Sequence, residues 1–360
     1  MEIDHVGDKS MILSDYTCSL LDDIENRINP EAEEDYLAQW KCFWNDEFQE
    51  PVFSPKRKNA AAPKIRLKNV HINDALHDFD LMLAYELEGV SKKLAGNEPL
   101  SIRANYGTGI MTSLFGAPIF EMPREMNTLP TTRSFNDSDK IREILDGGMP
   151  DLFGGFGGDV LRFGEYCSQI FEKYPKIKKY VKIYHPDTQG PLDIAELLWG
   201  SEMFYEMYDD TDFVHGVMRL ITDTYKAFLD KWYSIVPKEK ELSVHWGIIH
   251  RGNIMLRLDS AMNLSPDFYN EFSKPYDREL FDHFGGGCLH FCGRGDHYVE
   301  SACEIESLYG FNISQPHLND MSKIFAAAER NNKKILQLRD ASYYAELHGV
   351  KNGIVYQSKK

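Results

Sequence analysis

Hydrophobic positions along the chain follow two periods, one typical of strands and one typical of helices. Short runs of β-branched, aromatic or aliphatic residues alternate with longer stretches in which apolar residues recur every three or four positions. This alternation is the pattern of βαβ units, which build a parallel sheet covered by helices. The predicted strands span residues 100–106, 180–185, 242–250, 288–291, 311–315 and 334–338, and residues 354–356 would supply one more.

Several helices carry recognisable start signals. Residues 73–96 form one amphipathic pattern, with Asn73 as the expected N-cap. A longer helix beginning near Thr211 places its apolar residues on one stripe, as a cover for a sheet requires. Ser265 should cap a further helix. The glycine-rich residues 154–158 lack the Lys-Ser/Thr ending of a P-loop, so we expect a flexible turn before the next helix.

The order of these elements favours a (β/α)8 TIM-type barrel. No glycine-rich dinucleotide fingerprint follows a predicted strand, which argues against a doubly wound nucleotide-binding sheet. The first 60 or so residues are acidic and aromatic and read as a mostly helical extension. We therefore expect an N-terminal extension over residues 1–65 and an α/β barrel over residues 66–360, although the pattern does not establish all eight strands.

Composition narrows the class of protein. Hydrophobic residues make up 42% and charged residues 27% of the chain, which is ordinary for a globular protein. A formal net charge of -16 disfavours nucleic acid and anionic membranes as partners. No apolar run reaches the roughly 20 residues that span a bilayer, and the acidic start is unlike a signal peptide. We expect a cytoplasmic protein with a small-molecule substrate.

The strongest chemical signal lies in residues 285–297, around His290 and Cys292. The six cysteines are too scattered for a disulfide framework and should be reduced thiols. On a strand, alternate side chains share a face, so Cys288, His290 and Cys292 would point together and could hold zinc. The third ligand would be Cys288, His317 or Asp340. The alternative is a hydrogen-bonded histidine beside a buried thiol, with no metal.

A second signal combines His245, His250, Arg257 and Asp259 near the exit of a predicted strand. Charged groups at the carboxyl ends of barrel strands usually face the active site, and imidazole titrates near neutral pH. We therefore regard Asp259, His245 and His250 as candidate catalytic residues. Dispersed surface charge would explain them nearly as well.

Polar residues at other strand ends are candidates for contact with a substrate. A loop leaving the predicted strand 180–185 reads His-Pro-Asp-Thr-Gln-Gly-Pro, in which glycine and proline suit a tight turn before a helix. A similar polar, glycine-containing segment follows the strand near residue 100. The candidate substrate-binding residues are Asn105, Tyr106, His185, Asp187, Gln189, Arg257, Arg294 and Gln315.

These loops, in this order, resemble those of the uroporphyrinogen decarboxylase superfamily, which also contains cobalamin-dependent methyltransferases. The resemblance covers roughly residues 70–345. It rests on three motifs: Gln189-Gly190-Pro191, the helix start Leu264-Ser265-Pro266 with Pro275-Tyr276 ten residues on, and His290-Phe291-Cys292-Gly293. It implies a (β/α)8 barrel.

For the methyltransferase branch, the resemblance implies that His290 and Cys292 are zinc ligands, whereas the family's later cysteine ligand has no counterpart after Cys303. It further implies a corrinoid carried by a partner protein and a methyl group moved to a thiol. The alternative is a metal-free tetrapyrrole decarboxylase acting through Arg103, Arg257 and Arg294. A third reading is a non-catalytic barrel that binds a tetrapyrrole or a partner, and a homodimer is compatible with all three.

Overall fold

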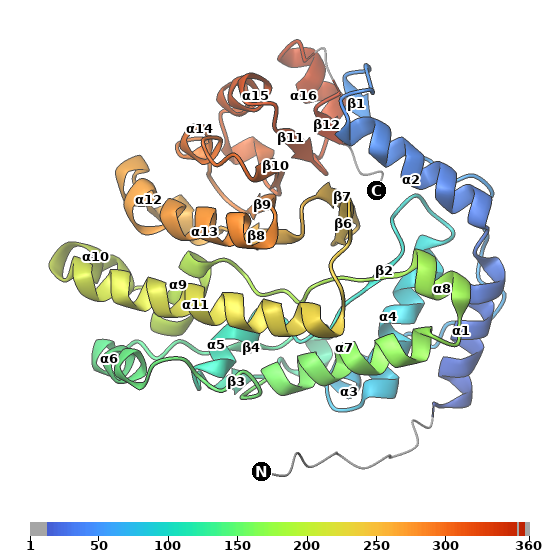
Figure 1. Ribbon diagram of the computed structural model, residues 1–360, viewed down its shortest axis with the longest axis horizontal. Coiled ribbons are helices and arrows are strands. Elements are labelled where there is room, and N and C mark those ends of the chain that lie inside the picture. The colour runs from blue at the N-terminus through green and yellow to red at the C-terminus, as the bar shows by residue number, and fades with distance from the viewer. Residues whose placement is uncertain (1–12, 351–352, 357–360) are drawn as a thin grey trace.

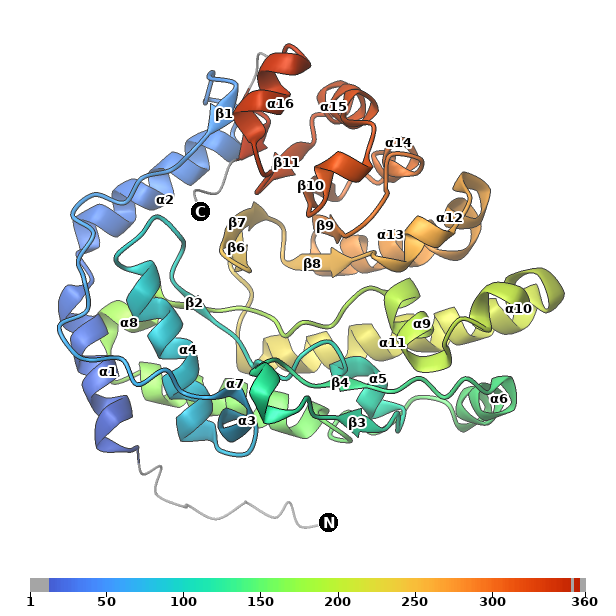
Figure 2. The same cartoon turned by 180° about the vertical axis from the view of Figure 1, so that it is seen from behind.

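Helices surround a central set of strands, as Figure 1 shows for the computed structural model, which describes residues 13–350 and 353–356. Segments far apart in the sequence lie side by side, since β1 is next to α16 in both views (Figures 1 and 2) and pairs with β12. The helices are α1 (Asp15–Arg27), α2 (Pro30–Trp44), α3 (Ile72–Ala75), α4 (Phe79–Lys93), α5 (Ile110–Leu114), α6 (Ser138–Gly147), α7 (Gly157–Phe171), α8 (Pro175–Tyr180), α9 (Pro191–Trp199), α10 (Met203–Asp209), α11 (Thr211–Ile235), α12 (Pro266–Phe272), α13 (Lys274–Phe284), α14 (Val299–Ala302), α15 (Met321–Arg330) and α16 (Ala341–Leu347).

The largest sheet has six parallel strands in the order β1-β12-β11-β10-β9-β8. A parallel pair β2-β5, an antiparallel pair β3-β4 and an antiparallel hairpin β6-β7 complete the strands. The strand bounds are β1 (Val52–Phe53), β2 (Ser101–Ile102), β3 (Ile119–Phe120), β4 (Thr131–Thr132), β5 (Lys182–Ile183), β6 (Leu242–His245), β7 (Ile248–Arg251), β8 (Ile254–Arg257), β9 (Gly287–Phe291), β10 (Leu308–Ile313), β11 (Lys334–Leu336) and β12 (Val355–Tyr356).

The parallel α/β arrangement is confirmed, but the described residues do not form one closed, hydrogen-bonded barrel. The ladder stops at β8 on one side and at β1 on the other, and the pair β2-β5 stands apart from it. At the first gap a side chain replaces the ladder, because the Met255 N–H donates to Nε2 of His185 over 3.0 Å. The fold is therefore TIM-like, with an interrupted sheet.

The prediction of one parallel strand over residues 242–250 is wrong. This segment folds back on itself as the antiparallel hairpin β6-β7. Trp246 and Gly247 form its two-residue turn with φ of 47° and 83°, and positive φ at both positions is typical of the tight turns that join hairpins. The parallel strand at this place is β8, which the hydrophobic pattern did not separate from the hairpin.

The helix predictions have mixed outcomes. Residues 73–96 form two helices, and Asp78 rather than Asn73 caps the longer one by accepting the N–H groups of Asp80 and Leu81. The helix from Thr211 is confirmed as α11. Ser265 is confirmed as the N-cap of α12, since its hydroxyl accepts the N–H of Phe268. No described helix combines the length and the apolar character that a membrane span needs.

Aromatic residues of the N-terminal extension fill one end of the sheet interior. Helix α2 and strand β1 contribute to a buried cluster that also contains residues of the hairpin and of β8, β9, β11 and β12. The Trp44 indole N–H donates to the carbonyl of Ile249 over 3.0 Å. The members from the extension are Tyr36, Trp40, Phe43, Trp44 and Phe53. The extension is thus part of the same core as the sheet.

Candidate metal centre and the cavities beside it

Strand register brings three polar side chains together on β8, β9 and β10, at one end of the large sheet. Arg257 on β8 pairs with His290 on β9, which in turn pairs with Asn312 on β10. One step down the same strands, Met255 pairs with Cys288, and both belong to the aromatic cluster of the extension. Because side chains two residues apart share a face of a strand, the polar layer lies directly above an apolar layer.

Three potential metal ligands meet above this layer. The ligand atoms of Asp259, His290 and Cys292 all lie within 4.8 Å of one another. His290 Nε2 is 3.5 Å from the Cys292 sulfur and 3.7 Å from Asp259 Oδ1. His290 is buried, while Asp259 and Cys292 are half-buried. Tetrahedral zinc with bonds of about 2.3 Å to sulfur and about 2.1 Å to nitrogen or oxygen places such atoms about 3.4–3.6 Å apart. The donor set fits zinc with one position left for a further ligand, and the two distances from His290 Nε2 are close to this spacing.

Asn312 fixes the tautomer of His290. The Asn312 amide nitrogen donates to the carbonyl of Leu336 over 2.8 Å, which leaves its Oδ1 as an acceptor. His290 Nδ1 lies 2.6 Å from that oxygen and must carry the proton. The unprotonated Nε2 then faces Asp259 and Cys292. A carbonyl-type partner on the second ring nitrogen is the usual support for a histidine that binds a metal.

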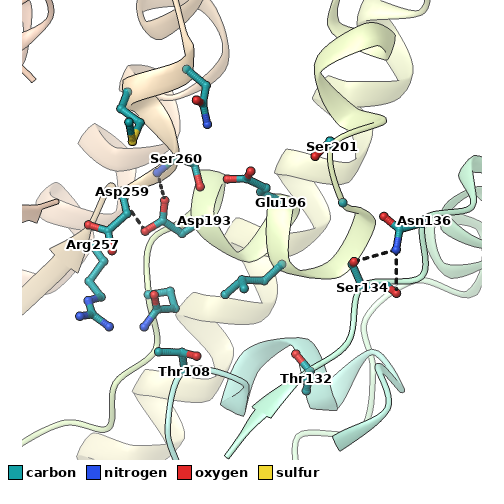
Figure 3. A pocket seen from close by; sticks show the side chains of 15 residues that line it. Thr108, Thr132, Ser134, Asn136, Asp193, Glu196, Ser201, Arg257, Asp259 and Ser260 are labelled. Carbon is teal, nitrogen blue, oxygen red and sulfur yellow. Dashed lines mark hydrogen bonds between the residues drawn. The ribbon is translucent and has the colours of Figure 1, made fainter. Parts of the chain in front are cut away.

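Asp259 is held in place through the backbone on both sides. Its Oδ1 accepts the Cys292 N–H over 2.6 Å. The N–H groups of Asp259 and Ser260 donate to the two carboxylate oxygens of Asp193 on α9, over 3.0 and 2.8 Å (Figure 3). Burial and, second, the nearby charge of Asp259 raise the pKa of Asp193 to about 6. The buried carboxylate of Asp193 therefore joins the segment that carries Asp259 to helix α9.

Burial sets the protonation of the other two groups. It lowers the pKa of His290, so the imidazole is neutral at pH 7 and its Nε2 lone pair is available to a metal. It raises the pKa of the Cys292 thiol, so the thiolate needs a cation beside it to be stable. The lowered pKa of His290 removes proton competition at Nε2, whereas a metal has to displace the proton of Cys292.

A large cavity of about 1050 Å³ opens in front of His290. Arg103 and Arg257 both reach the same carboxylate oxygen of Asp187, at 3.3 and 3.4 Å. The Arg257 guanidinium also lies over the ring of Trp246, 4.8 Å from its centre, and the Trp246 ring meets that of His290 edge-on. Two guanidinium groups that share one carboxylate leave a net positive wall, which suits an anionic group on a ligand.

A second cavity of about 600 Å³ lies on the other side of Arg257 and Asp259 (Figure 3). Gln189 lines it from a backbone with φ of 65°, which is uncommon for a residue with a side chain. The adjacent Gly190 is required, because a Cβ there would lie 2.2 Å from the carbonyl oxygen of Arg257. The loop 186–190 is thus pressed against β8, and its strain lies at the site.

The three suggested third ligands lie elsewhere. Cys288 is fully buried in the aromatic cluster below the site. His317 is an exposed residue of the short 3-10 turn Pro316–Leu318. Asp340 lines the large cavity but does not belong to the group of converging ligands. In their place the structure offers Asp259, which we expected to act in catalysis rather than as a ligand.

The three predicted site histidines outside β9 form a buried group. His185 and His245 lie with ring centres 4.3 Å apart, and burial lowers the pKa of each. His250 is also fully buried, and burial lowers its pKa to about 4. None of the three lines either cavity. His185 acts as the side-chain bridge to Met255 at the gap in the sheet.

The remaining predicted residues are spread around the site. The Asn105 amide donates to Glu86, and Tyr106 is buried against Phe156. Gln315 accepts the Gly293 N–H and so shapes the loop after Cys292. Arg294 is exposed and pairs with Asp296, away from both cavities. Asp187, Gln189 and Arg257 line the cavities.

Sequence reasoning missed Asn312, Asp193 and Trp246. The signal for Asn312 was a lone polar residue within an otherwise apolar strand. Asp193 was detectable as an acidic residue in the buried first turn of α9, and Trp246 as the residue before a glycine in a hairpin turn. Only the neighbours in space show what each side chain does.

Comparison with known proteins supports the fold. No protein-family model and no curated protein sequence matches the chain. Among solved structures, the chain is similar to a methyltransferase from Methanosarcina mazei. The TM-score is 0.60 at 14% sequence identity, and the match covers 95% of this chain and 92% of that chain. At this identity the likeness shows a shared fold. The resemblance to the uroporphyrinogen decarboxylase superfamily stays a prediction.

Proposed function

We propose that this chain is a zinc-dependent methyltransferase that moves a methyl group from a corrinoid partner protein to a thiol. The observation that carries the proposal is the convergence of Asp259, His290 and Cys292, whose ligand atoms lie within 4.8 Å of one another. The shared fold with a protein named as a methyltransferase supports it. Zinc, when bound, would hold the acceptor thiol as a thiolate at neutral pH.

The protein's own residues would bind and orient the acceptor. Arg103 and Arg257 present cationic groups to the large cavity, within which His290 lies. An acceptor with an anionic group at these arginines would direct its thiol toward the metal ligands. Trp246 closes the space between Arg257 and His290 and reduces the access of water. Positioning of this kind contributes to catalysis by keeping the reacting atoms close.

Metal analysis of the purified protein tests the zinc site. We expect about one zinc per chain, and loss of that zinc in His290→Ala and Cys292→Ala. Cys288→Ala is the matched control, since Cys288 lies on the same strand two residues before His290 but outside the ligand group. Zinc below about a tenth of stoichiometric, or equal zinc in the Cys292 and Cys288 variants, would refute the site.

Turnover tests the reaction itself. The zinc-loaded protein, mixed with methylcobalamin and small thiols that carry a carboxylate or sulfonate, should demethylate the cobalamin and form a thioether. Removal of zinc should abolish the change in cobalamin absorbance that accompanies demethylation. A zinc-loaded protein without activity toward all of these thiols would count against thiol methylation.

One observation favours the decarboxylase alternative. Arg103 and Arg257 face a cavity large enough for a sizeable acidic ligand, although Arg294 lies away from it. Turnover of uroporphyrinogen that persists without zinc and is lost in Arg257→Ala would establish this second function. A protein that is inactive in both assays would favour the third hypothesis, a non-catalytic barrel that binds a tetrapyrrole or a partner.

A further inference from the structure

The smaller cavity differs from the larger one in the charge of its walls. Residues from β4, from α9 and from the segment after β8 enclose about 600 Å³. Figure 3 shows Asp193 and Glu196 projecting from α9 toward the segment that carries Asp259 and Ser260. The lining therefore contains three carboxylates and one cationic side chain, Arg257.

Arg257 does not neutralise these carboxylates. Its guanidinium turns to Asp187 and Trp246 in the larger cavity. Both oxygens of Asp193 are occupied by backbone N–H groups. Glu196, in contrast, is half-buried, and its carboxylate has no ion pair or hydrogen-bond partner among the residues that the structure describes. A half-buried carboxylate without a partner needs a cation or hydrogen-bond donors from a ligand.

Gln189 independently points to the same ligand chemistry. It is 4% exposed, and its amide nitrogen donates to Asp187 over 2.8 Å. Within residues 13–350 and 353–356, no group donates to its Oε1, and Gln189 lines the smaller cavity. This hydrogen bond to Asp187 holds the side chain in place. A ligand in the cavity could therefore use Oε1 of Gln189 as an acceptor in addition to the Glu196 carboxylate.

The rest of the lining selects among cations. Hydroxyl and amide side chains predominate, and none of the described lining residues is aromatic. Quaternary ammonium ions are recognised mainly by aromatic faces, whereas a primary ammonium ion needs acceptor oxygens for its N–H groups. Hydroxyl groups on the ligand would meet the polar lining: Thr108, Thr132, Ser134, Asn136, Ser201 and Asn263.

We propose that the smaller cavity binds a small hydroxylated primary ammonium ion, with Glu196 as its counter-ion and Gln189 as a second acceptor. This site does not depend on the proposed methyl transfer. It lies beside the metal ligands, because Asp259 belongs to both. An amine bound here would occupy a second chamber next to the same reaction centre.

Calorimetric titration of the intact protein with ethanolamine tests the site. Ethylene glycol, without charge, and choline, without N–H donors, serve as matched probes and should bind at least about tenfold more weakly. Glu196→Gln keeps the shape of the side chain and should weaken ethanolamine binding roughly 10-fold to 100-fold, the value of one charge-assisted hydrogen bond. Glu202→Gln, an exposed residue outside the cavity, should leave binding unchanged.

Three results would overturn the proposal: no ethanolamine binding up to about 100 mM, equal binding of choline, or equal binding by Glu196→Gln. The titration is repeated on Cys292→Ala to separate the cavity from the metal ligands. Unchanged binding there supports the cavity as the site. If Cys292→Ala no longer binds ethanolamine while Glu196→Gln still does, the binding signal would come from a metal instead.

Discussion

Replacing Asn312 by alanine tests whether His290 is a supported metal ligand. The substitution removes two buried hydrogen bonds, one from His290 Nδ1 at 2.6 Å and one to the Leu336 carbonyl at 2.8 Å. Loss of a partner on the second ring nitrogen typically weakens metal binding about 10-fold to 100-fold. This corresponds to about 1.4–2.7 kcal/mol. We therefore expect the zinc dissociation constant of Asn312→Ala to rise by one to two orders of magnitude, measured by competition with a chromophoric chelator.

The control must separate this effect from general destabilisation. Asn105→Ala also removes a buried amide, since Asn105 follows β2 and donates to Glu86 on α4. Each variant should lose about 1–3 kcal/mol of unfolding free energy, because a buried hydrogen bond is broken. Only Asn312→Ala should lose zinc affinity. Equal zinc affinity in the two variants would refute the role of Asn312 in orienting His290.

Three further predictions concern stability, measured by urea unfolding. Burial raises the pKa of Asp277 to about 7. Between about pH 4 and 7 the unfolded state loses this proton while the folded state keeps it, so the free energy of unfolding falls as the pH rises. Over that range the unfolding free energy of Asp277→Asn should increase relative to that of the wild type, by about 4 kcal/mol at most. A pH-independent difference would contradict this. Gly287→Ala should destabilise the protein strongly, since the added Cβ would lie 1.9 Å from a carbonyl oxygen of β8. Gly89→Ala, at an open position in α4, should instead raise the free energy of unfolding by about 0.5–1 kcal/mol. Similar effects of the two substitutions would count against the close approach of the strands. Arg57→Met breaks the buried ion pair with Glu33 and should cost about 3–5 kcal/mol, and a loss below about 1 kcal/mol would show that the extension is not anchored there.

The sequence by itself determined the features that depend on neighbours along the chain. The start of α12 at Ser265 and the stripe of α11 follow from capping and from helical periodicity, which act within a few residues. The alternation of strands likewise placed His290 and Cys292 near the end of a parallel strand. These predictions needed no knowledge of the rest of the fold.

Where the prediction failed locally, two local signals competed. Residues 242–250 carry enough β-branched and aromatic residues for one strand, but Trp246-Gly247 is also a hairpin turn. Periodicity cannot choose between these structures, because the residues on both sides of the turn alternate in the same way. Packing of the hairpin against the aromatic cluster of the extension accompanies the folded-back form.

Only the tertiary structure decided which groups complete the candidate site. Asp259 reaches His290 because β8 lies next to β9, and Asn312 reaches it because β10 lies on the other side. The order and register of strands depend on contacts between residues more than twenty positions apart, which no local pattern records. The same holds for Glu196, which becomes an unpaired carboxylate in a cavity only because α9 packs beside the segment after β8.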